Sequence, residues 1–527
     1  MIRILTSLVV ALSISPLKAQ MGTSDVPKLV VGITVDQLRG DYIEQFKHNF
    51  GERGFKRLLS GGLVYQNISF DFPNLNQANT LATIYTGANP NQHNITDVEK
   101  YSPESSLVKN IFLDDNFLGN YTQDRLSPLA LSGSTIADEL KVASGNLSDV
   151  FAFAPNAVQA LITGGHAANS TYWIDDYSGK WASTTYYKDF YWTVDQDNRK
   201  VTSFAAKVWG GQWKPLVEKK EYKTFPYVKT QGAFQQSLGG NKETYKLAKY
   251  TPFANENIRE TFENLLSKAN LGNRGVPDFV SLTFYAGRYP KSDDDYGVEM
   301  KDLYIRLDKD IESLLDNIDK TIGLQNTLIF LTSTGYYESV VHDEEKIPTG
   351  GGTFHVDRCE ALLNMYLMAL YGQNEKWVQK IYNGQIFLNR ELIKAKELKL
   401  SEIQQVAAEF VSEFSGVLAV YTQHQLLFDN LSPEKEYMKR GLAKASMGDL
   451  VLEIQPSYKV VHEKSNDTEK LTRSNMISCP VIFFGNNIKA EKIKTTIKAT
   501  EIAPSVAYIM RIRAPSAAKE LPLAEFL

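Results

Sequence analysis

Acidic and histidine side chains gather at two places where they could bind a divalent metal ion. One cluster is Asp293-Asp294-Asp295, and the other is His342-Asp343-Glu344-Glu345. Carboxylate and imidazole groups are common ligands of such ions. Consecutive side chains cannot all face one ion, however, unless a loop wraps around it. We therefore interpret both clusters as solvated loops.

Thiol chemistry and phosphate-loop chemistry find little support in the sequence. Cys359 and Cys479 are the only cysteines, which excludes a disulfide scaffold and a thiolate zinc site. They could pair in an oxidising compartment, although we favour two buried thiols. The glycine run at residues 350–352 lacks the lysine and the following helix of a phosphate-binding loop.

The composition is typical of a folded protein without a nucleic-acid partner. The chain has 527 residues, of which 43% are hydrophobic and 22% are charged, and its net charge is −4. A disordered chain would contain fewer apolar residues, and a nucleic-acid-binding surface would be basic. We therefore expect a large core and no nucleic acid as a partner.

The N-terminus predicts export. Arg3 precedes a short apolar run at residues 8–14, and Ala19 offers a small residue before a cleavage site. We predict a signal peptide at residues 1–19 and a mature chain at residues 20–527 that is periplasmic or extracellular. A buried N-terminal helix is the alternative. No later run reaches the roughly 18 apolar residues of a membrane-spanning helix, so none is expected in the mature chain.

Continuous apolar runs predict the strands that would position any site residue. The first run, residues 28–35, ends in Asp36, and similar runs lie at residues 150–153, 279–284, 327–332, 450–454 and 481–484. Such runs are typical of strands that are covered on both faces. Helical periodicity lies between them, for example at residues 300–318. The alternation predicts an α/β fold, as one large domain with insertions.

Two stretches interrupt this alternation. Residues 172–250 predict an inserted cap, and residues 374–440, which are helical and charged, predict a second insertion or an edge. The cap is rich in aromatic residues, namely Tyr172, Trp173, Trp181, Tyr186, Tyr187, Tyr191 and Trp192. We interpret these side chains mostly as core packing. A stacking platform for a sugar or a peptide is the alternative.

Recognisable motifs follow one another along nearly the whole mature chain. They are VGITVDQLR at residues 31–39, TIYTGANPNQH at 83–93, GGHAAN at 164–169 with Tyr172-Trp173, YIRLDKD at 304–310, IPTG at 347–350, GDL at 448–450, CPVIFFG at 479–485 and TEIAPSVA at 500–507. Together they resemble the alkaline phosphatase superfamily. They are most similar to its phosphate-irrepressible branch, which is related to the nucleotide pyrophosphatase/phosphodiesterases. The resemblance implies a sandwich with a mostly parallel central sheet and helices on both faces.

The resemblance also implies two-metal phosphoryl transfer. In such a site two zinc ions, about 4 Å apart, hold the attacking and leaving oxygens. A Thr or Ser at a helix N-terminus is the nucleophile, and about six Asp and His side chains bind the metals.

This sequence departs from that pattern at most of the matching positions. Asp36 keeps the first metal-ligand position, but the nucleophile position, ten residues before Gly87, holds Gln77. An amide cannot attack phosphorus. The other five ligand positions have lost their Asp or His and hold Arg288, Ser292, Ser333, Thr334 and Ser478. The family's histidine after the nucleophile is replaced by Leu81, and its phosphate-contacting Lys and Arg by Asn156 and Val158.

Several alternatives follow from these replacements. Arg288 puts a cation where two dications would sit, so we expect Asp36 and Arg288 to form an ion pair instead. Thr80 could replace the lost nucleophile if its helix began three residues later, although it would restore no metal ligand. His93 and His166 lie in motifs but outside the ligand positions, and we interpret them as structural.

The sequence therefore predicts an exported pseudoenzyme of the alkaline phosphatase type. We expect no catalytic residue and no cofactor, and a sealed former pocket that serves binding or assembly with an envelope or secreted protein. The alternative is an active phosphomonoesterase or phosphodiesterase with a non-standard site and two zinc ions. A carbohydrate- or nucleotide-binding protein that uses the cap is a third possibility.

Overall fold

The computed structural model describes residues 26–188, 190–217, 234–292, 297–337, 351–372, 374–430, 432–456, 458–463, 470–471 and 476–527. The predicted signal peptide and the acidic clusters at residues 293–295 and 342–345 lie outside these residues. Among the described residues, no helix is long and apolar enough to cross a membrane.

Ten strands form the central sheet, in the order β21-β2-β20-β12-β1-β11-β6-β7-β8-β5. Neighbouring strands run parallel at β12-β1-β11-β6-β7 and at β2-β21, and antiparallel around β20 and β8. The strands are β1 (Leu29–Asp36), β2 (Leu63–Ser69), β5 (Gly119–Asn120), β6 (Val150–Ala154), β7 (Ser170–Ile174), β8 (Trp181–Thr184), β11 (Asp278–Tyr285), β12 (Thr327–Ser333), β20 (Val481–Gly485) and β21 (Glu491–Lys498).

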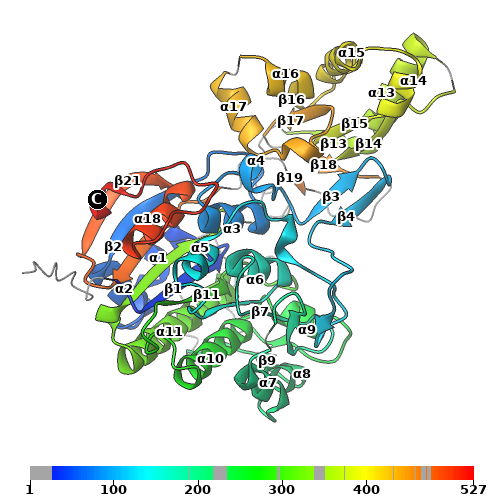
Figure 1. Cartoon of the computed structure of the whole chain (residues 1–527). Helices are drawn as coiled ribbons and strands as arrows, with labels where there is room; N and C mark the ends of the chain where they lie inside the picture. Colours follow the sequence, from blue (N-terminus) through cyan, green and yellow to red (C-terminus); the bar gives the residue numbers. More distant parts are fainter. Residues whose placement is uncertain are drawn as a thin grey trace, which may run out of the picture.

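Helices cover both faces of this sheet (Figure 1). One face packs against α1 (Gly40–Phe46), α2 (Phe55–Gly61), α10 (Pro252–Lys268) and α11 (Gly297–Thr321). The other packs against α3 (Gln77–Thr86), α5 (Ile136–Ala143), α6 (Ala157–Gly164) and α18 (Ile502–Ile509). All residues of β1, β11 and β12 are buried, as the continuous apolar runs predict for strands covered on both sides. The predicted α/β fold is therefore confirmed.

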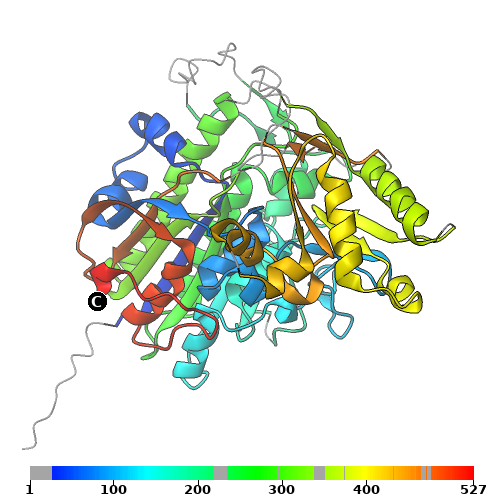
Figure 2. The same ribbon diagram turned by 90° about the horizontal axis from the view of Figure 1, so that it is seen from above.

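Residues 351–463 build a second lobe with its own core. Its four-stranded antiparallel sheet has the order β14-β15-β17-β16. In Figures 1 and 2 its yellow and orange helices lie at one side of the central sheet, away from the C-terminus. The elements are β13 (Thr353–His355), α13 (Val356–Tyr371), β14 (Val378–Tyr382), β15 (Gln385–Leu388), α14 (Arg390–Ala395), α15 (Leu400–Ser412), β16 (Val417–Thr422), α16 (Gln423–Phe428), α17 (Pro433–Arg440), β17 (Leu450–Ile454) and β18 (Lys459–Val461).

Two further groups of elements lie outside the central sheet and the second lobe. The hairpin of β3 (Glu99–Ser102) and β4 (Leu107–Asn110) reaches the second lobe, where the rings of Tyr101 and Phe387 lie 4.9 Å apart. The segment after β8 contains α7 (Trp192–Arg199), α8 (Phe204–Trp209), β9 (Gln212–Trp213), β10 (Gln236–Ser237) and α9 (Thr244–Ala248). The predicted boundaries of the two insertions stay predictions.

The aromatic residues of 172–250 divide into a buried majority and an exposed remainder. Tyr172, Trp173, Trp181 and Tyr187 are buried in the two sheet-facing clusters, whereas Trp192 is 54% exposed. Most of these rings therefore pack in the core. Cys359 and Cys479 are both buried and are not joined in a disulfide.

Candidate functional site

The sheet gathers the predicted site positions at one edge. β1, β11 and β12 are parallel and end together, with Asp36 beside Tyr285 and Val35 beside Ser333. Thr334 and Arg288 follow two of these strand ends. Ser478 lies before β20, which runs antiparallel to β12, so it approaches the same edge. Open α/β sheets bind their ligands at this edge, beyond the carboxyl ends of the strands.

The Asp36 carboxylate is buried and is held by two neutral donors. The Thr334 hydroxyl donates to Asp36 Oδ1 at 2.9 Å, and the Gln159 amide donates to Oδ2 at 3.2 Å. Thr334 Oγ1 also accepts from the backbone N–H of Gln37 at 3.0 Å. Asp36 is 4% exposed and Thr334 is fully buried. Both oxygens that would face a metal ion therefore have a donor from the protein.

The other former ligand positions also have structural partners. Arg288 Nη2 donates to the Ser292 carbonyl at 2.8 Å, and the Ser292 hydroxyl donates to the Glu299 carboxylate. The Ser478 hydroxyl donates to the Asn67 side chain. The contacts described for Asp36 come from Gln159 and Thr334, and the expected ion pair between Asp36 and Arg288 stays a prediction.

Ser333 lies in a buried polar cluster with Cys479. Its hydroxyl accepts a hydrogen bond from the backbone N–H of Gly335 at 3.1 Å and forms a hydrogen bond with the Cys479 thiol. Burial raises the pKa of Cys479 to about 12. Thiolates are the form that binds metals and attacks electrophiles, and this shift favours the protonated thiol at neutral pH.

The N-terminus of α3 is capped by its own side chains. Gln77 is the first residue of the helix, and the side-chain oxygen Oδ1 of Asn76 accepts from the backbone N–H groups of Ala78 and Asn79, both at 3.0 Å. These N–H groups are the ones that would hold a phosphate at a helix start. Thr80 is fully buried, and its hydroxyl donates to the backbone carbonyl of Asn76 at 2.7 Å. The helix does not begin three residues later, so the condition for Thr80 as a nucleophile is not met.

Gln159 joins the start of α6 to Asp36. Its Oε1 accepts from the backbone N–H of Asn156 at 3.2 Å, while its Nε2 donates to Asp36. Asn156 and Gln159 form a capping box. The sequence analysis missed Gln159, although the Asn-x-x-Gln spacing at a helix start is a signal for this arrangement.

The described residues do not fit two zinc ions. Asp36 is the only Asp or His left among the six ligand positions, Arg288 is a cation that repels metal ions, and Ser and Thr hydroxyls are poor zinc ligands. Within the described part of the chain, no three His, Cys, Asp or Glu side chains come together in a way that could hold a metal ion.

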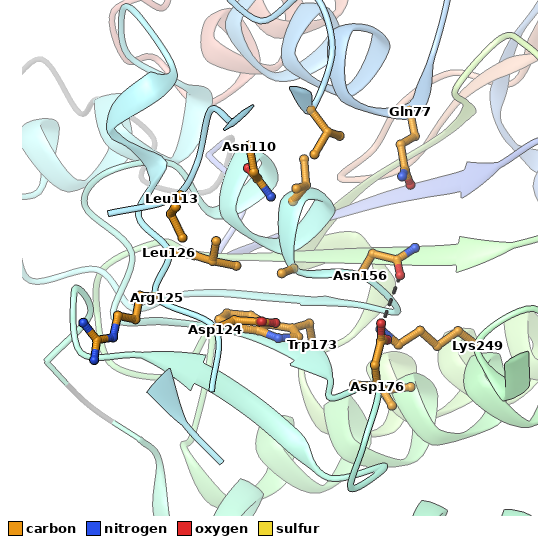
Figure 3. A pocket seen from close by; sticks show the side chains of 14 residues that line it. Gln77, Asn110, Leu113, Asp124, Arg125, Leu126, Asn156, Trp173, Asp176 and Lys249 are labelled. Carbon is orange, nitrogen blue, oxygen red and sulfur yellow. Dashed lines mark hydrogen bonds and ion pairs between the residues drawn. The ribbon is translucent and has the colours of Figure 1, made fainter. Parts of the chain in front are cut away.

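A pocket of about 280 Å³ lies beside this edge (Figure 3). Of the predicted site residues only Gln77 lines it, together with the two former phosphate-contact positions, Asn156 and Val158. Its other walls come from distant segments: Val98, Asn110, Leu113, Asp124, Arg125, Leu126, Ala157, Trp173, Ile174, Asp176 and Lys249.

Lys249 is the buried cation of this pocket. It is 4% exposed, forms an ion pair with Asp176 and donates to Asn156 Oδ1 at 3.4 Å. Burial lowers the pKa of Lys249, and the charges of Asp176, Asp175 and Asp124 oppose that shift. The sequence analysis missed Lys249. It lies between α9 and α10, and no local pattern shows that the fold brings it to the start of α6.

The two motif histidines have structural partners. His166 Nδ1 lies 3.0 Å from Asp138 Oδ2, and this hydrogen bond raises the pKa of His166. His93 is fully buried next to the Thr83 hydroxyl at 3.1 Å, and burial lowers its pKa to about 3.

Comparisons with known proteins match this geometry to a phosphoesterase fold. The profile of the family described as type I phosphodiesterase / nucleotide pyrophosphatase matches residues 30–476. Alkaline phosphatase PafA of Elizabethkingia meningoseptica is 26% identical over 537 residues, which cover 95% of this chain and 94% of that protein. Alkaline phosphatase PhoV of Synechococcus elongatus is 26% identical over 522 residues, which cover 93% of this chain and 91% of that protein. A protein of Myroides odoratus named calcium-transporting ATPase is 28% identical over 531 residues, which cover 95% of this chain and 94% of that protein.

The solved structures agree with the sequence relatives. The crystal structure of wild-type alkaline phosphatase PafA matches with a TM-score of 0.79 and 24% identity, over 95% of this chain and 99% of that one. The predicted alkaline phosphatase-type fold is thereby confirmed.

Proposed function

Since this chain belongs to the type I phosphodiesterase / nucleotide pyrophosphatase family, we propose that it keeps the family's scaffold without metal-dependent hydrolysis and acts by binding. The observation that carries this proposal is the state of Asp36. Its two oxygens accept hydrogen bonds from Thr334 and Gln159, and no other former ligand position holds an Asp or a His. A zinc ion would have to displace both donors and would find one carboxylate.

The lost nucleophile supports the same proposal. Gln77 stands at the first residue of α3, where a nucleophile would need a hydroxyl or thiol. The helix starts of α3 and α6 are closed by the side chains of Asn76 and Gln159. A phosphate ester would compete with these caps for the backbone N–H groups.

An active phosphoesterase with a non-standard site is the second candidate. The names of two relatives, both alkaline phosphatases, favour it. It requires metal ligands or a nucleophile other than those at the matching positions. The contacts of Asp36 and the burial of Thr80 speak against it.

Export and a protein partner complete the proposal. The N-terminal residues support secretion through a signal peptide, and an exported non-catalytic scaffold would meet envelope or secreted proteins. Co-purification of the protein from the envelope fraction would identify such a partner.

Turnover assays on the purified mature protein test the proposal. We expect no hydrolysis of p-nitrophenyl phosphate or bis-p-nitrophenyl phosphate, with or without added zinc. An Asp36→Asn variant is the control, because it removes the one carboxylate a metal could use. Hydrolysis that requires zinc and is lost in Asp36→Asn would contradict the proposal and support the second candidate.

A further inference from the structure

The pocket beside the former site is lined by polar and apolar side chains, and the polar ones include both hydrogen-bond donors and acceptors (Figure 3). From this set we infer that the pocket binds a neutral polyhydroxylated ligand, such as a single sugar ring. The inference rests on the proposed binding function and names the ligand class for it.

Trp173 supplies a donor that lacks an acceptor. Its side chain is 1% exposed and lines the pocket, and its indole N–H has no hydrogen-bond partner among the described residues. A buried N–H without a partner is unfavourable, and few occur in native proteins. Because the indole nitrogen is itself buried, an oxygen of a ligand in the pocket would accept this hydrogen bond after a small rotation of the Trp173 side chain.

The charges of the pocket disfavour an anion. Lys249 is flanked by the carboxylates of Asp176, Asp175 and Asp124, so its positive charge is already balanced. Figure 3 shows the guanidinium of Arg125 pointing away from the other labelled side chains. It also lies 3.6 Å from Asp115. A phosphate would therefore meet carboxylates without an unbalanced cation.

Hydroxyl groups match the remaining polar atoms. Carboxylates such as Asp124 only accept hydrogen bonds, the Lys249 ammonium and the Trp173 indole only donate, and the amides of Gln77 and Asn110 do both. A hydroxyl can donate and accept, whereas an ionised phosphate only accepts. The apolar walls would face the C–H groups of a sugar.

The volume limits the size of the ligand. The pocket measures about 280 Å³, near the lower end of the roughly 300–1,000 Å³ of small-molecule sites. We therefore expect one sugar ring rather than an oligosaccharide.

Ligand-observed NMR and calorimetry test the inference on the mature protein. The probes are glucose, galactose, mannose and N-acetylglucosamine, compared with glucose 6-phosphate and inorganic phosphate. We expect at least one neutral sugar to bind, and the phosphates to bind at least tenfold more weakly. Failure of every neutral sugar to bind, or tighter binding of the phosphates, would overturn the inference.

Two variants link binding to the pocket. Trp173→Phe removes the indole N–H and keeps an aromatic ring, so we expect about fivefold weaker binding. Trp377→Phe is the matched control, because this buried indole donates to the Gly372 carbonyl in the second lobe, and binding should not change. Asp124→Asn, at an exposed position, should weaken binding about tenfold without affecting folding. Wild-type affinity in both pocket variants would contradict the inference.

The outcome is separable from that of the proposed function. Zinc-dependent turnover would refute the loss of catalysis, whether or not the protein binds a sugar. An inactive protein that binds no neutral sugar would refute only the ligand class.

Discussion

At the scale of single residues, neutral hydrogen-bond donors hold the one carboxylate that remains at the family's ligand positions. Asp36 remains, but its donors are the Thr334 hydroxyl and the Gln159 amide. A buried carboxylate needs such donors, because a charge without partners in the interior is strongly unfavourable. Thr334 thus takes a structural role at a position where the family would place a metal ligand.

Replacing Thr334 by Val should therefore destabilise the protein. The variant removes the donor to Asp36 Oδ1 and the acceptor of the Gln37 N–H, so we expect a loss of about 1–3 kcal/mol in the free energy of unfolding. Urea denaturation measures it. Thr332→Val is the matched control, because the Thr332 hydroxyl is buried without a hydrogen-bond partner among the described residues and should be replaced at little cost. Equal stabilities of the two variants would contradict this role.

His166 should make stability depend on pH. Its pKa is raised above 6.5 because of the hydrogen bond to Asp138. The stabilisation is therefore fully present below pH 6.5 and is lost as the pH rises through the folded-state pKa. In His166→Gln this fall in stability above pH 6.5 should disappear, as thermal unfolding at several pH values would show. A variant with the wild-type pH profile would refute the assignment.

At the scale of elements, the helices whose starts would face a phosphate are capped from within. Asn76 binds two backbone N–H groups of α3, and Gln159 binds the first free N–H of the α6 start. The apolar runs predicted the buried strands of the central sheet. They could not show that Leu450–Ile454 joins the sheet of the second lobe, because an apolar run predicts a strand but does not identify the strand that pairs with it.

Replacing Asn76 by Ala should destabilise α3 by about 1 kcal/mol or more, since two N–H groups lose their acceptor. Chemical denaturation would measure the change. Ser60→Ala is the control, because the exposed Ser60 hydroxyl bonds only backbone carbonyls of its own helix turn. The Asn76→Ala variant should gain no phosphatase activity, because opening the helix start restores neither nucleophile nor metal ligands. Any activity gained would count against the loss of the site.

At the scale of the whole molecule, the pocket joins segments that are far apart in sequence. The lining includes Gln77 at the start of α3, Asp124 after β5, Asn156 before α6, Trp173 in β7 and Lys249 before α10. The motifs predicted the sheet edge and the substituted positions. They did not predict Lys249 or the indole N–H of Trp173, which has no partner in the part of the chain that the structure describes, because both depend on tertiary packing rather than on spacing.

Metal removal should leave the folded protein unchanged. A ligand at 100 times its dissociation constant stabilises the native state by about 2.7 kcal/mol, so a bound zinc pair would raise the melting temperature. We expect the same melting temperature after treatment with a chelator and after addition of zinc. A clear decrease with the chelator that zinc reverses would indicate a metal site.

Elemental analysis of zinc in the mature protein, purified in the presence of zinc and freed of excess ion, shows directly whether the matching positions bind metal. We expect far less than one zinc per chain and the same value in Asp36→Asn. About two zinc ions per chain, lost in Asp36→Asn, would contradict this expectation.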